Sequence, residues 1–109
     1  MEEIIVTTTN ELPGYEVTAV QGEVFGLIVR ARNVFSNFGA QFRVIVGGEA
    51  RGYTKLLSDS RNQAIDRLRD AARERGGNAV LAMRFDCIEI AGMMSEVAAY
   101  GTSVTVRRR

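Results

Sequence analysis

The chain has 109 residues, of which 46% are hydrophobic and 25% are charged, and its net charge is +1. These values are typical of one globular domain and exclude a disordered or fibrous chain. Because the only dense basic run is residues 107–109, we expect no binding to nucleic acid or to anionic membranes.

The start of the chain does not have the basic and apolar segments of a secretory signal. No run of residues reaches the roughly 18 apolar residues that a membrane span needs. Cys87 is the single cysteine, so the chain cannot form an internal disulfide. A protein without disulfides fits a reducing compartment, and we therefore expect a cytoplasmic protein.

The first third of the chain is rich in β-branched residues. Residues 4–9 predict a strand, and Pro13 followed by Gly14 predicts a turn. Residues 15–32 then predict one long strand, and glycines 22 and 26 within it indicate bends or bulges.

Two helices are predicted in the middle of the chain. Asn33 or Ser36 is a suitable N-cap for a short helix that ends at residues 47–48, a glycine pair. A longer amphipathic helix is predicted from about residue 54 to residue 75, and the glycines at residues 76–77 form its C-cap.

The last two strands, residues 79–90 and 96–106, predict a hairpin with Gly92 and Met93 at its turn. This register places Phe85 opposite Tyr100 and Glu89 opposite Glu96. One hairpin face would then support both helices, and its residues are Leu81, Met83, Phe85, Cys87, Ala98, Tyr100, Val104 and Val106. The second face is too apolar for contact with water, and its residues are Val80, Ala82, Arg84, Asp86, Ile88, Val97, Ala99, Gly101 and Ser103. We therefore expect another subunit to cover either this face or the projecting end of the long strand.

The expected fold class is therefore α+β, with a single domain over residues 1–109. We expect a four-stranded, mainly antiparallel sheet with one long bent strand and two helices packed on one face.

Two facing glutamates, Glu89 and Glu96, would repel each other unless something compensates their charge. A bound cation, an arginine such as Arg30 or Arg84, or a shared proton would each provide compensation. The alternative is a longer turn, a slipped register, and two glutamates that point into water.

Soft metal ions need several cysteine or histidine ligands, and the chain has one cysteine and no histidine. A symmetric ring would repeat each ligand, so Cys87 or a carboxylate could line a central metal site. The alternative is that Cys87 packs in the core, where free cysteines are common. Arg30 and Arg32 could form an anion pocket between subunits or bind a neighbour's carboxylates.

Several segments resemble the YbjQ-type family of small bacterial proteins. They include RNVFSN at residues 32–37, GYTKLL at residues 52–57, MRFD at residues 83–86 and the threonine-rich start at residues 5–9. The resemblance covers nearly the whole chain in the same order. It implies a dodecin-like subunit that assembles as a homopentamer, in a family described as heavy-metal binders by structural comparison.

The first function expected is therefore a homo-oligomeric ring that binds a heavy metal or small ligand, with a metal ion as the candidate cofactor. The alternative is a structural or protein-interaction ring with no ligand. An enzyme is not expected, because the sequence offers no recognisable catalytic set or cofactor loop.

Overall fold

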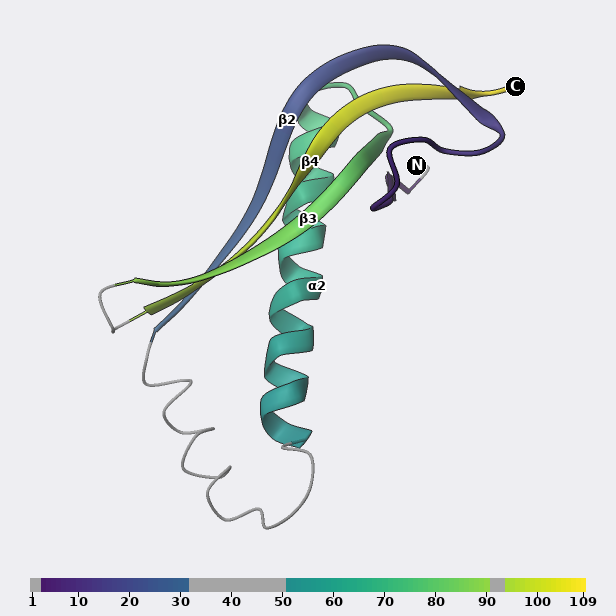
Figure 1. Cartoon of the computed structure of the whole chain (residues 1–109). Helices are drawn as coiled ribbons and strands as arrows, with labels where there is room; N and C mark the ends of the chain where they lie inside the picture. Colours follow the sequence, from purple (N-terminus) through teal and green to yellow (C-terminus); the bar gives the residue numbers. More distant parts are fainter. Residues whose placement is uncertain (1–2, 32–50, 91–93) are drawn as a thin grey trace.

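A computed structural model of the chain describes residues 3–31, 51–90 and 94–109. The described residues form a four-stranded sheet and one long helix (Figure 1). The elements are β1 (Ile5–Val6), β2 (Tyr15–Ala31), α2 (Arg51–Glu74), β3 (Ala79–Ile90) and β4 (Met94–Arg108). The strand order is β1-β3-β4-β2, in which β1 is parallel to β3 and the other neighbours are antiparallel.

The fold remains α+β, but the expected two helices on a mainly antiparallel sheet are wrong in detail. The sheet is mixed, and the described part of the chain contains one helix. The predicted short helix after Asn33 or Ser36 lies outside the described residues. The predicted strand at residues 4–9 shrinks to two residues. Beyond them, Thr7 and Thr9 hydrogen-bond to each other through their hydroxyls, and their carbonyls accept from the amides of Met83 and Ala82, at the irregular part of β3.

The long bent strand occurs as predicted, from Tyr15 to Ala31. Its pairing with β4 shifts twice, between Val17 and Ala19 and between Val20 and Gly22. Gly22 has a φ of 110°, which places one of the bends at a predicted glycine.

The long helix α2 packs closely on the sheet through Ala64, Leu68 and Ala72, which are fully buried. It ends in a Schellman motif, because the Gly76 amide donates to the Arg73 carbonyl and the Gly77 amide to the Ala72 carbonyl. The predicted C-cap is therefore confirmed. Within the described residues, no helix is long and apolar enough to cross a membrane.

The β3–β4 register differs by one residue from the predicted one. Ile90 pairs with Met94, so three residues separate the strands where a two-residue turn was expected. A second irregularity lies between Leu81 and Arg84, where Ala82 has a φ of 54°.

These two differences exchange the faces of several side chains, because neighbouring residues in a strand point to opposite sides of a sheet. Val97 and Ala99 pack beneath α2, whereas Ala98 and Tyr100, which were expected there, line the other face. A second core cluster lies near the start of β3 and packs against the N-terminal segment. Its buried residues are Ala79, Leu81, Val104 and Val106, and they contact Ile5, Leu12 and Tyr15.

Candidate functional site

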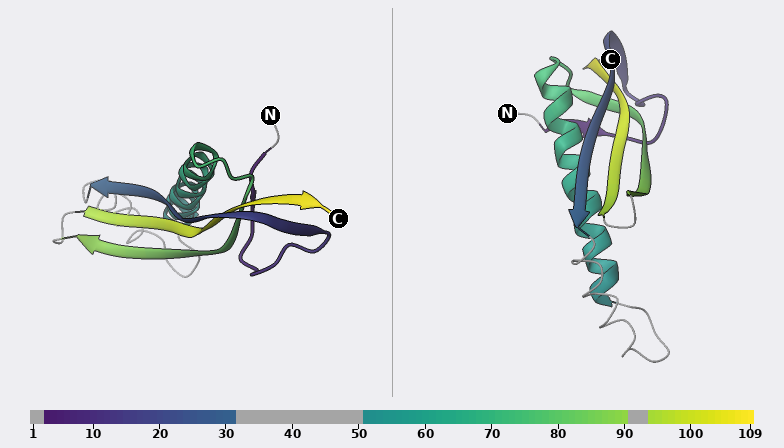
Figure 2. Two further views of the ribbon diagram at one scale, coloured as in Figure 1. Left: turned by 90° about the horizontal axis from the view of Figure 1, so that it is seen from above. Right: turned by 90° about the vertical axis from the view of Figure 1, so that its left-hand side faces the viewer.

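In the described part of the chain, α2 covers one side of the sheet and much of the other side has no cover (Figure 2). We define the open face as the uncovered surface formed by Glu23, Phe25, Leu27, Val29, Asp86, Ile88, Glu96, Ala98 and Tyr100. The exposed fractions of four large side chains on it are 52% for Phe25, 43% for Leu27, 51% for Val29 and 53% for Ile88. A contiguous exposed apolar patch of this kind is typical of interaction surfaces.

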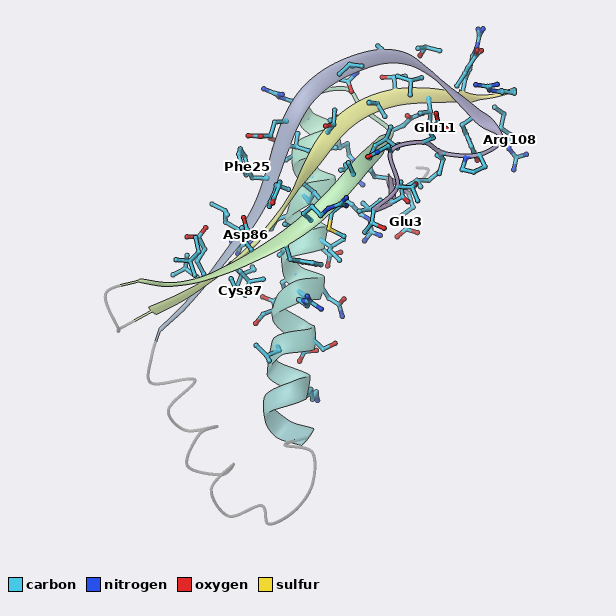
Figure 3. The ribbon with its side chains drawn as sticks, in the orientation of Figure 1. Glu3, Glu11, Phe25, Asp86, Cys87 and Arg108 are labelled. Carbon is cyan, nitrogen blue, oxygen red and sulfur yellow. The ribbon has the colours of Figure 1, made fainter. Side chains whose placement is uncertain are left out.

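The strand register explains how these residues come together. Ala98 pairs with Asp86 on one side and Leu27 on the other, and Glu96 pairs with Ile88 and Val29. Side chains in such rows lie on the same face of a sheet. They surround a shallow hollow of about 410 Å³. Two of its residues, Phe25 and Asp86, are labelled in Figure 3.

The open face is acidic as well as apolar. Three carboxylates, from Glu23, Asp86 and Glu96, line its hollow. Among the described residues, none of the three takes part in a salt bridge. The face therefore offers unpaired negative charge beside exposed apolar side chains.

The predicted Glu89 and Glu96 pair is corrected by this register. Glu89 pairs with Ser95, and Glu96 pairs with Ile88. The longer connection between β3 and β4 was the alternative considered from the sequence, and it removes the direct opposition of the two carboxylates. Glu96 contributes to the open face, and for Glu89 only the backbone pairing is described.

Cys87 lies on the helix side of the sheet and is exposed. Its thiol lines a hollow of about 400 Å³ with Leu57, Ser58, Arg61 and Val97. The burial considered from the sequence does not occur, because α2 presents an exposed Leu57 here and Arg61 stacks on the Phe85 ring at 4.6 Å.

The structure does not show the arginines considered from the sequence, Arg30, Arg32 and Arg84, in contact with Glu89 or Glu96. Arg84 Nη1 donates to the carbonyl oxygens of Thr8 and Met83, each at 2.9 Å, so it anchors the N-terminal segment. Arg30 is described by its backbone pairing with Ser95 alone, and Arg32 lies outside the described residues.

The described part of the chain does not present a complete metal site. No group of three or more Cys, Asp or Glu side chains there is arranged to hold an ion. Glu96 and Cys87 also occupy opposite faces, because Glu96 lines the open face and Cys87 lies on the helix side. Cys87 and Glu96 therefore do not form one metal site within the described part of the chain.

The sequence analysis placed Asp86 on the second hairpin face but missed Glu23, Phe25 and Leu27 as residues of the open face. A signal for the open face was present in β2, where residues 24 and 28 are apolar and the alternating residues 25, 27 and 29 are apolar too. A strand that is apolar on both faces needs cover on both faces.

The profile of the YbjQ family, described as "Putative heavy-metal-binding", matches residues 4–107. A UPF0145 protein from Acidothermus cellulolyticus is 54% identical over 105 residues, which cover 96% of this chain and 97% of the relative. The UPF0145 protein YjfJ from Lactococcus lactis is 52% identical over 108 residues, which cover 99% of this chain and 99% of the relative.

A solved structure has a similar fold. It is a protein of unknown function of the DUF74 family from Pediococcus pentosaceus, with a TM-score of 0.61 and 15% identity, and the match covers 95% of this chain and 98% of that one. At this identity the likeness concerns the fold alone. The profile match and the relatives at more than 50% identity show that the chain belongs to the YbjQ family.

Proposed function

We propose that the protein is a homo-oligomeric metal-binding protein whose copies assemble by burying the open face. The observation that carries the proposal is the exposure of Phe25, Leu27, Val29 and Ile88 on one side of the sheet. Copies that contact each other through unlike surfaces form a closed ring when the rotation between them closes. A ring of five is the form that the family resemblance implies.

Within this assembly, the heavy-metal ligand is the Cys87 thiol, contributed by several copies. Soft metal ions prefer thiolate ligands, and Cys87 is the chain's single cysteine and is exposed. The family description supports a metal ligand, and the incomplete set in one subunit explains why several copies are needed.

Metal content measured per subunit tests the ligand assignment. Untagged protein purified without chelators is expected to carry a fixed ratio of metal to ring, and Cys87→Ser is expected to lose the metal while retaining its oligomeric mass. Ser58→Ala is a matched control, because Ser58 lines the same hollow without offering sulfur.

A double variant, Glu89→Gln with Glu96→Gln, separates the two sets of predicted ligands. If this variant loses the metal and Cys87→Ser retains it, the glutamates are the metal ligands and Cys87 is not. Metal-free wild-type protein that still failed to bind added Zn²⁺ or Cd²⁺ would contradict the metal function.

The second candidate function is an assembly or protein-interaction ring without a ligand. It is favoured by the absence, among the described residues, of any group of three potential metal ligands. An oligomer of normal mass that binds no metal is the result that this candidate predicts.

A further inference from the structure

Beyond the start of β3, strands β2 and β4 continue as a projecting two-stranded ribbon. Ala79 at the start of β3 pairs with Val104, whereas β2 and β4 remain paired as far as Tyr15 and Arg108. We define the arm as residues 15–20 and 105–109; Figure 1 shows it curving away from α2. It carries the exposed side chains of Val17 and Val20.

The tip of the arm is basic. Arg107 is paired with Glu16, and the Arg109 Nε donates to the Tyr15 carbonyl at 3.2 Å. Arg108 is exposed and has no ion-pair partner in the described part of the chain. The arm therefore presents free guanidinium charge beside exposed valines.

The open face has the complementary properties, with three unpaired carboxylates beside Phe25, Leu27 and Ile88. A chain cannot bring its own arm onto this face, because Arg108 lies at one end of the molecule and Asp86 and Phe25 lie on the other half (Figure 3). A second copy of the same chain can supply the matching surface.

We infer that the arm of one copy docks on the open face of the next, with Arg108 and Arg109 against the carboxylates of Asp86 and Glu96. Arginine is suited to this role, because its planar fork can bind a carboxylate through two hydrogen bonds. The valines of the arm would cover the apolar part of the same face. This inference rests on the proposed homo-oligomer and identifies the surfaces that join its subunits.

The contact joins two different surfaces, so the arm of each copy binds one neighbour and its open face binds the arm of another. Such head-to-tail contacts produce a ring when they close and a filament when they do not. The arm therefore explains how a single chain can form a ring without a two-fold symmetric interface.

Charge reversal on each side of the contact tests the inference, with light scattering after size-exclusion chromatography as the measurement. Arg108→Glu with Arg109→Glu is expected to raise the subunit dissociation constant by more than ~100-fold, because like charges then face each other. Asp86→Arg with Glu96→Arg is expected to have the same effect. Combining the four substitutions in one chain is expected to restore the oligomer.

Lys55→Glu is the control, since it makes the same type of charge change at an exposed position of α2. Circular dichroism of each variant checks that the subunit is folded. The arm contact would be contradicted if an arm variant kept the wild-type mass, or if the chain with all four substitutions failed to reassemble. Either result would still be compatible with a homo-oligomer. A monomeric wild-type protein would overturn both.

Discussion

Gly26 is a residue of β2 at which the backbone of α2 approaches closely. A Cβ atom at this position would lie 2.0 Å from the Ala64 carbonyl oxygen and 2.5 Å from the Leu68 amide nitrogen. The sequence suggested a bend here, but the pairing with β4 is regular at Gly26. The need for glycine comes from a contact with a helix some forty residues later, which a local pattern does not reveal.

Gly26→Ala is therefore expected to lower the free energy of unfolding by about 3 kcal/mol, because helix and strand backbone must separate to admit the methyl group. Urea unfolding at a fixed protein concentration provides the measurement. Gly14→Ala is the control, because Gly14 has a φ of 84° and no atom within 4 Å of the added methyl, which leaves a backbone cost of about 1 kcal/mol. Equal losses in the two variants would contradict the close approach.

The solvent exposure of Cys87 could not be predicted from its position in the strand. Its place on the helix side of the sheet was expected, but its exposure depends on where α2 stops covering that side. That point is set by the packing of Ala64, Leu68 and Ala72, so the environment of the thiol is a property of the packed helix.

At the scale of elements, local patterns located the strands well and their pairing less well. The bounds of β3 at Ala79 and Ile90 agree with the prediction, because alternation and β-branched residues are local signals. The β3–β4 register was wrong by one residue, since three residues connect the strands instead of two. A shift of one residue reverses the face of every later side chain, which is why Tyr100 was expected beneath the helix.

Asn78 joins β4 to the start of β3 through its side chain. Its Nδ2 donates to the Val106 carbonyl at 2.9 Å, and its Oδ1 accepts from the Val106 amide at 2.8 Å. The amide group thus takes the place of a backbone partner and extends the ladder by one position.

Asn78→Ala is expected to cost about 2 kcal/mol of unfolding free energy, because the amide and carbonyl of buried Val106 lose their partner. Hydrogen exchange should also become faster at the Val106 amide. Asn62→Ala, at an exposed position of α2, is the matched control. Unchanged protection of the Val106 amide in Asn78→Ala would contradict this role.

At the scale of the whole molecule, the described chain is more extended than a compact domain of its length. Its radius of gyration is 16.9 Å and its dimensions are 53 × 29 × 24 Å. A compact chain of this length has a radius of gyration of about 13 Å. The projecting arm and the long helix α2 both contribute to this extended shape (Figure 1). The arm and the open face are surfaces that a second copy can bury.

The sequence predicted the need for a partner, because the hairpin offered more apolar surface than one layer of helices could cover. It placed Asp86 and Ile88 on that surface but did not predict the residues that β2 contributes. Phe25 and Leu27 reach it from β2, and Asp86 and Ile88 reach it from β3, so the surface exists only once the register is known.

The molar mass of the untagged protein in solution, measured by light scattering at micromolar concentration, tests the proposed assembly most directly. The proposal predicts a single species with a mass several times the 12.0 kDa of the chain, and five times that mass for the ring that the resemblance implies. A folded, stable species of 12.0 kDa would contradict it, because Phe25, Leu27, Val29 and Ile88 would then remain in contact with water.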